Sequence, residues 1–231
     1  MNMLSALYCE TIKVLRSLVF WVTFIVFAVS FALMIFAIPR SWAMFFDIFL
    51  MNTANVGLYV SFFVAAWVFG REFMDKTNKD LIAKPISRTT VVLSKFIVIF
   101  LWGIVFMLFL LLFNLCVAFL LGFTGFTTVL FYEALRKFIA AFLLYIMICP
   151  SGAFFASISK GILAPIGILF VIAIAATILA NTDAAVYFPW TIPGLFFKAG
   201  RLSPVSIVIL IATGTAGIAG TLAWWRFAEQ K

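Results

Sequence analysis

The sequence predicts an all-α integral membrane protein with six transmembrane helices. Of its 231 residues, 66% are hydrophobic and only 10% are charged, and the mean hydropathy is +1.24. Soluble domains of this size do not have such a composition. Six stretches without a charged residue are each long enough to cross about 30 Å of hydrocarbon as a helix. The net charge of +8 lies mainly at the ends of these stretches, which favours a topological role over nucleic-acid binding.

The first residues, 1–16, are expected to form an interfacial helix or, equally, a cytoplasmic extension of the first span. Their apolar residues recur near the helical period, and Glu10, Lys13 and Arg16 are placed elsewhere. The expected transmembrane helices are residues 17–39, 48–70, 96–121, 138–159, 161–182 and 204–225. The third apolar region is too long for one span, so Gly122 and Gly125 are expected to end it. A short interfacial helix is then expected over residues 126–137.

The orientation follows from the positive-inside rule. With a cytoplasmic N-terminus, eleven of the sixteen Lys and Arg residues fall on the inside and five on the outside. We therefore expect both termini, and the loop 71–95, to face the cytoplasm. Residues 160–161 form the short turn between the fourth and fifth spans.

The loop 71–95 is the most polar part of the chain. Three acids each precede a lysine by four residues, in the order that stabilises a helix: Glu72 and Lys76, Asp75 and Lys79, Asp80 and Lys84. Pro85 would end this helix, and Ser87 can cap the next one. We expect an amphipathic helix on the membrane surface that presents a charged face to a soluble partner.

The segment 183–203 has the opposite character, because it combines prolines and aromatic residues with few charges. It contains Phe188, Pro189, Trp190 and Pro193. Such a segment is expected to dip into the membrane as a re-entrant loop where protein buries its backbone. Two interpretations are open: an outer gate made by these four residues, or an aromatic belt that anchors the spans.

The sixth span carries small residues at helical spacing. Thr213, Gly217 and Thr221 lie four residues apart, with Gly214 and Gly220 beside them. This pattern predicts close packing against another helix, either within the chain or between subunits.

The sequence offers no catalytic or metal-binding group. It has no histidine, its three cysteines are not paired in spacing, and it lacks the phosphate-binding motif G-x-x-x-x-G-K-[ST]. No charged residue is expected deep in a span, which disfavours an ion-coupled carrier. An ATPase in a separate chain, acting on the loop 71–95, would supply the missing energy source. An ATP-independent channel or carrier and a membrane scaffold stay open as alternatives.

The loop resembles the cytoplasmic signature of the type-2 ABC transporter permeases, the ABC-2 membrane family. The matching residues are Glu72, Thr77, Leu81, Pro85, Arg88 and Lys95, and Lys76 stands where the family commonly has glycine. Residues 76–88 and 188–193 together look like the bacitracin-resistance and lantibiotic-immunity permeases.

The resemblance implies a function and a set of partners. The chain would be the permease subunit of an ATP-driven exporter in a bacterial plasma membrane, moving a bacitracin- or lantibiotic-like peptide, or alternatively a lipid, sodium or a small drug. It would not be an enzyme and would bind no cofactor; ATP and Mg²⁺ would bind two copies of a separate ATPase. A second copy or a sister permease would complete the dimer. The implied interfacial helix is the elbow helix, and the implied docking residues of the coupling helix are Glu72, Asp75, Thr77, Lys79, Leu81, Pro85 and Arg88.

Overall fold

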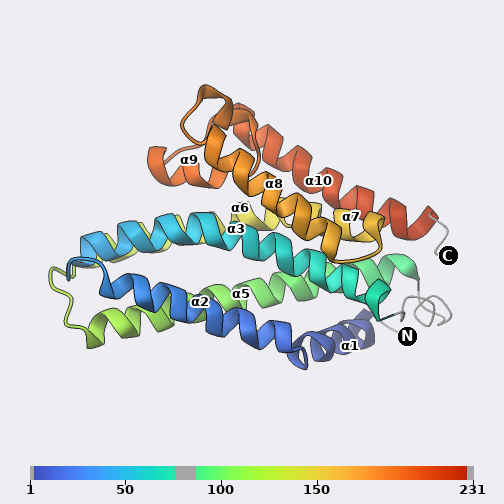
Figure 1. Cartoon of the computed structure of the whole chain (residues 1–231), viewed down its shortest axis with the longest axis horizontal. Helices are drawn as coiled ribbons and strands as arrows, with labels where there is room; N and C mark the ends of the chain where they lie inside the picture. The colour runs from blue at the N-terminus through green and yellow to red at the C-terminus, as the bar shows by residue number, and fades with distance from the viewer. Residues whose placement is uncertain (1–2, 76–86, 228–231) are drawn as a thin grey trace.

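The computed structural model describes residues 3–75 and 87–227, and every regular element in these ranges is a helix (Figure 1). The elements are α1 (Met3–Leu15), α2 (Leu18–Phe36), α3 (Trp42–Met74), α5 (Arg88–Leu120), α6 (Thr128–Ile148), α7 (Pro150–Ser159), α8 (Leu163–Leu179), the 3-10 helix η1 (Asp183–Tyr187), α9 (Ile192–Ala199) and α10 (Pro204–Phe227). The long helices run roughly side by side. Both termini and α1 lie at one end of the molecule, and the α2–α3 and α5–α6 connections lie at the other.

Within the described ranges, five helices are long and apolar enough to cross a membrane: α2, α3, α5, the pair α6–α7 (128–159) and α10. The remaining expected span, the fifth (161–182), corresponds to α8, whose 17 residues extend over only about 26 Å at 1.5 Å per residue. In contrast, α3 and α5 have 33 residues each, or about 50 Å. Their ends therefore project beyond the roughly 30 Å of a hydrocarbon core, and polar groups can gather there.

The expected interfacial helix over residues 126–137 does not exist as a separate element. Residues 128–148 form the single helix α6, which begins where the Thr127 side chain accepts a hydrogen bond from the Leu130 N–H at 3.3 Å. Ala134 and Phe138 are both buried one turn apart, on the same face of this helix. The sequence contains no glycine or proline between Thr127 and Pro150, so nothing interrupts the helix earlier.

The two connections at the end of the molecule away from α1 are joined to each other. Gly122 and Gly125 end the third apolar region as expected, and both have positive φ, +72° and +78°. The backbone N–H of Trp42 donates to the Thr124 carbonyl at 3.1 Å, and the Trp42 indole donates to the Phe123 carbonyl at 3.0 Å. These bonds fix the start of α3 against the turn that follows α5.

The small residues of α10 pack within the chain, against α6 and α7. A Cβ at Gly214 would lie 2.6 Å from the Met147 carbonyl oxygen, and one at Gly217 would lie 2.7 Å from the Pro150 carbonyl carbon. The two helix backbones therefore touch where a side chain would hold them apart. The predicted close packing is confirmed, and the partner is the kinked pair α6–α7.

Candidate functional site

The most unusual feature of the structure is a buried lysine in the second turn of α5. Lys95 has no exposed surface. Its Nζ donates to Glu10 Oε2 and to Glu72 Oε1, both at 2.8 Å, and to the Val68 carbonyl at 3.3 Å. Three helices therefore meet at one ammonium group: α1 supplies Glu10, α3 supplies Glu72, and α5 supplies Lys95.

A second lysine completes this group. Lys13 Nζ lies 2.6 Å from Glu10 Oε1 and 2.9 Å from Glu72 Oε1. We call these four side chains (Glu10, Lys13, Glu72 and Lys95) the ion cluster. Among the described residues, two carboxylates face two ammonium groups, so these four charges balance, which is the condition for burying ions at tolerable cost.

The electrostatics of the cluster are visible at Lys13, which lies on α1. Burial opposes the positive charge of this side chain and by itself would lower its pKa. The carboxylates of Glu10 and Glu72 outweigh that effect, so the pKa of Lys13 is raised above its ordinary value. Lys13 is therefore a permanent cation in the cluster at neutral pH.

The orientation of α1 brings Glu10 into the cluster. Ala6, Glu10 and Val14 are spaced four residues apart and are all buried against the rest of the chain, chiefly α5. Leu4 and Tyr8 lie on the outer face and are 77% and 68% exposed. Leu4 and Tyr8 thus point outward, and the face toward the protein carries Glu10 between the apolar Ala6 and Val14.

Arg88 forms a second link at the same end of the molecule. Its Nη1 donates to the carbonyls of Trp225, at 3.2 Å, and Arg226, at 3.4 Å. These carbonyls belong to the last turn of α10, where helix oxygens lack partners within the helix and favour a cation. The Trp225 indole in turn donates to Ser157 Oγ on α7 at 3.0 Å.

Three of the expected docking residues lie among the described residues, and the structure places them in different surroundings. Glu72 is buried in the ion cluster, which corrects the expectation that it belongs to an exposed charged face, and Arg88 contacts α10. Asp75 is exposed at the end of α3, where Oδ2 lies 3.7 Å from Arg71 Nε. The remaining expected docking residues, with Lys76, lie outside the described residues: Thr77, Lys79, Leu81 and Pro85.

The four residues expected to form a gate lie near the other end of the molecule. The rings of Phe188 and Trp190 lie 5.1 Å apart, and Pro193 is buried in the first turn of α9. The Thr191 hydroxyl donates to the carbonyls of Ala185, at 2.5 Å, and Phe188, at 2.7 Å, so the turn between η1 and α9 is well defined. Pro189 is half-buried in this turn.

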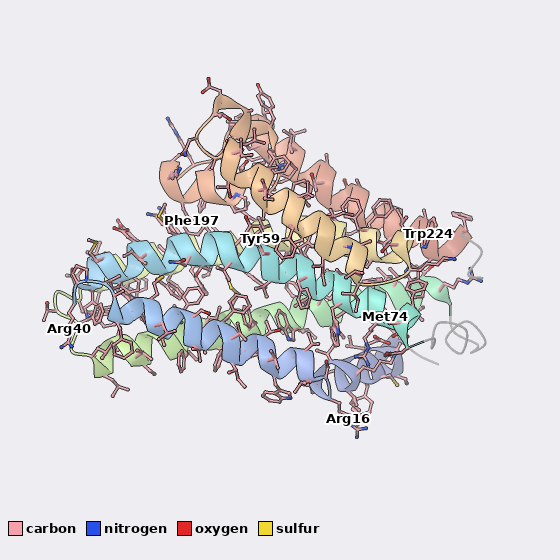
Figure 2. The ribbon with its side chains drawn as sticks, viewed as in Figure 1. Arg16, Arg40, Tyr59, Met74, Phe197 and Trp224 are labelled. Atoms are coloured by element: carbon pink, nitrogen blue, oxygen red, sulfur yellow. The ribbon has the colours of Figure 1, made fainter. Side chains whose placement is uncertain are left out.

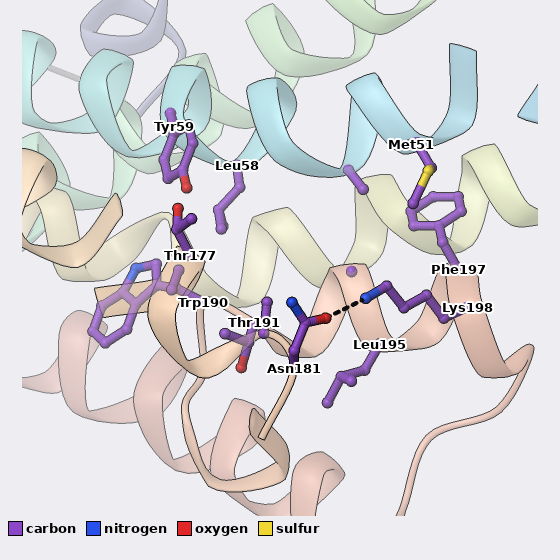
Figure 3. A pocket seen from close by; sticks show the side chains of 14 residues that line it. Met51, Leu58, Tyr59, Thr177, Asn181, Trp190, Thr191, Leu195, Phe197 and Lys198 are labelled. Carbon is purple, nitrogen blue, oxygen red and sulfur yellow. Dashed lines mark hydrogen bonds between the residues drawn. The ribbon is translucent and has the colours of Figure 1, made fainter. Parts of the chain in front are cut away.

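A cavity of about 420 Å³ lies beside these residues, between α3, α8 and α9 (Figure 3). Trp190 and Thr191 are part of its lining, and the close-up shows Lys198 extending toward Asn181. Lys198 Nζ lies 3.3 Å from Asn181 Oδ1. Of the four expected gate residues, the structure therefore places Trp190 in the lining of a space large enough for a ligand.

Reasoning from the sequence missed the ion cluster. Its members are far apart in the chain: Glu10 and Lys95 are 85 residues apart, and Lys13 and Glu72 are 59 apart. One signal was available, because Lys95 lies among apolar residues close to a span, where a charged side chain is costly unless it is paired.

The comparisons with known proteins agree with this architecture. Residues 6–176 match the family described as ABC-2 family transporter protein, which is well over half of the chain. Over 170 residues the chain is 26% identical to the bacitracin transport permease protein BCRB of Bacillus licheniformis; the match covers 71% of this chain and 80% of that one. Together with the apolar helices, these matches identify a multi-pass transmembrane permease that resembles the bacitracin-resistance permeases. The chain belongs to the ABC-2 family of transporter proteins.

Proposed function

We propose that this chain is the membrane subunit of an ATP-driven exporter that moves a hydrophobic or amphipathic antimicrobial peptide out of the cell or its membrane. A separate ABC ATPase, in two copies, would dock on the loop 71–95, and a second permease would complete the assembly. Membership of the ABC-2 family supports an ATPase partner in general. The peptide cargo takes its support from the 26% identical protein whose name includes bacitracin transport.

The observation that carries the proposal is that ion pairs and hydrogen bonds link the helix ends on both sides of the proposed docking loop 71–95. The last described residue before the loop's central part, Asp75, lies three positions after Glu72 of the ion cluster. On the far side, Arg88 begins α5 and contacts the last turn of α10. A force on the loop would therefore reach α1, α3, α5 and α10 through ionic and hydrogen-bonded links.

Links of this kind between helix ends suit a permease that alternates between two conformations. A partner chain performs work on a permease only by contacting its two states differently. In this proposal α1 is the elbow helix, with the outward-pointing Leu4 and Tyr8 in the membrane interface, and the ion cluster couples it to α3 and α5. Movement of the loop would then shift these three helix ends as one unit.

We propose six spans, with α8 as the fifth, a re-entrant segment over η1 and α9, and both termini in the cytoplasm. The distribution of cations supports this orientation. Figure 2 places Arg16, Met74 and Trp224 at the end of the molecule where α1 lies, and Arg40 at the opposite end. The loop 71–95 is the most basic segment of the chain and joins helices at the α1 end, which is the end expected inside.

A pull-down tests the docking proposal. The tagged chain, purified from native membranes, is expected to bring with it a stoichiometric ATP-binding subunit that Leu81→Asp removes. The control is Leu163→Asp, which places the same change at a residue that is 85% exposed and lies in α8, outside the loop. If the ATPase is retained by Leu81→Asp, or if no ATPase accompanies the wild-type chain, the docking assignment is wrong.

The gate proposal needs a separate assay, because it concerns transport and not assembly. Trp190→Ala is expected to reduce peptide resistance in cells while the ATPase still co-purifies. Tyr187→Ala is the matched control, because Tyr187 belongs to the same segment but is 65% exposed. Unchanged resistance in Trp190→Ala would leave Trp190 as a membrane anchor.

A further inference from the structure

The cavity between α3, α8 and α9 has the size of a ligand site. Its volume of about 420 Å³ falls within the roughly 300–1,000 Å³ of typical small-molecule pockets. Met51 and Leu58 of α3, Ala176 of α8, and Leu195 and Phe197 of α9 give it apolar walls. Since these walls come from three different elements, the shape of the cavity depends on how α9 is held against α3 and α8.

Two polar groups of the cavity, the Trp190 indole and the Lys198 ammonium, can only donate hydrogen bonds. The Trp190 indole Nε1 is buried and has no hydrogen-bond partner among the described residues. An unpaired donor in a buried position is costly and uncommon in native structures. Figure 3 shows the Tyr59 hydroxyl also directed into this region, opposite Thr177. The Thr177 hydroxyl donates within its own helix, to the Ala173 carbonyl at 2.9 Å.

The mouth of the cavity is positively charged. Lys198 lines it and is exposed, with Asn181 as its only described partner, at 3.3 Å. A neighbouring hollow of about 270 Å³ shares Met51, Phe197 and Lys198 with the cavity and adds Lys137 and Asp47. The ammonium groups of Lys137 and Lys198 outnumber the carboxylate of Asp47 here, so the region attracts an anion.

We infer that this cavity binds an amphiphile with an anionic headgroup, such as an alkyl phosphate. The apolar chain would lie against Leu58 and Phe197, and the headgroup would accept hydrogen bonds from Lys198 and the Trp190 indole. The apolar walls match the alkyl chain of such a molecule. The unpaired indole donor and the excess of positive charge match its anionic headgroup. The inference rests on the proposed function for its role in transport, since the ligand could be a membrane lipid or part of the cargo.

Binding can be measured on the full chain without an ATPase. The chain is reconstituted in nanodiscs of zwitterionic lipid, and a photoreactive dodecyl phosphate is cross-linked to it. Peptide mapping is expected to place the cross-links on α3 and α9. Unlabelled dodecyl phosphate and phosphatidylglycerol should compete, whereas dodecyltrimethylammonium and inorganic phosphate should not. Competition by phosphatidylglycerol at the same affinity as dodecyl phosphate would identify membrane lipid as a source of the ligand. Weaker competition would favour an anionic amphiphile that is not a two-chain bilayer lipid.

Three variants test the assigned donors. Lys198→Gln should weaken binding about tenfold, which corresponds to about 1.4 kcal/mol. Trp190→Phe, which keeps a ring and removes the N–H, should weaken it severalfold. Lys160→Gln removes an exposed cation at the turn between α7 and α8, and should leave the affinity unchanged.

Several results would overturn the inference. Equal competition by the cationic amphiphile would show that charge is not recognised, and competition by inorganic phosphate alone would show that the apolar walls are not used. An equal loss of affinity in Lys198→Gln and Lys160→Gln would mean that the anionic ligand is attracted by the net positive charge of the chain and not by this site. None of these results depends on ATPase docking, so a failure of the pull-down and a failure of this binding assay are distinguishable.

Discussion

Replacing Lys95 with methionine gives the sharpest test of the ion cluster. The substitution keeps a long apolar stem in a site without exposed surface and removes only the ammonium group. Glu10 Oε2 then loses its partner at 2.8 Å, and among the described residues Lys13 is the cation that remains beside the two carboxylates. The described part of this buried site then holds one more negative than positive charge.

The cost can be worked out from this geometry. Breaking a buried ion pair by removing one partner costs about 3–5 kcal/mol. Lys13 still contacts both carboxylates, so we expect about 3 kcal/mol for Lys95→Met. Glu10→Gln leaves two cations with one carboxylate and should cost about 2 kcal/mol by the same reasoning. In the double variant Glu72 and Lys13 remain, so their charges balance again. Its loss in free energy of unfolding should therefore be smaller, by about 1.5 kcal/mol, than the sum of the losses in the two single variants.

The assay is a titration of the purified chain in mixed micelles with a denaturing detergent. Tryptophan fluorescence reports unfolding, since the chain contains seven tryptophans. Lys160→Met makes the same chemical change at an exposed residue and is expected to cost less than about 0.5 kcal/mol. Strictly additive losses in the double variant, or a Lys95→Met variant as stable as Lys160→Met, would refute the reasoning.

Two further predictions concern helix packing and helix ends. Gly217→Ala should destabilise the chain by about 1–3 kcal/mol because its Cβ would meet the α7 backbone at 2.7 Å. The same change at Gly167 in α8, where no atom lies within 4 Å, should stabilise by up to about 1 kcal/mol; losses of equal size at both sites in the detergent titration would contradict the packing argument. Arg88→Gln should speed amide hydrogen exchange in the last turn of α10 by removing the bond to the Trp225 carbonyl, and an unchanged exchange rate would mean that this bond contributes nothing.

The sequence predicted the helical class well because long apolar stretches determine it almost alone. The charge-free residues 17–39 contain all of α2, and the charge-free residues 96–121 contain α5 from residue 96 to its end. The separate interfacial helix over residues 126–137 was wrong because Arg136 and Lys137 were taken to end it, whereas α6 continues through both to Ile148. The stripe around Gly217 predicted close packing, but no local pattern could say that α6 and α7 were the partners.

The site was harder to predict, because its contacts are not local. The four-residue spacing of Glu72 and Lys76 placed Glu72 on an exposed helix face, whereas the structure buries Glu72 and gives it Lys13 of α1 and Lys95 of α5 as partners among the described residues. Arg88 was assigned to docking from its place in the loop, yet it lies against residues 137 and 138 positions away. Spacing rules describe neighbours on one helix, and both side chains act between helices.

The position of Lys95 also bears on how the protein enters the membrane during synthesis. Both acids that neutralise Lys95 precede it in the chain, Glu10 by 85 residues and Glu72 by 23. Glu10 and Glu72 are therefore synthesised before Lys95. When α5 inserts, both carboxylates can already lie at the membrane surface. In the reverse order, a bare ammonium would have to lie at the edge of the hydrocarbon until its partners arrived. The order of residues along the chain thus spares α5 the cost of inserting an unpaired charge.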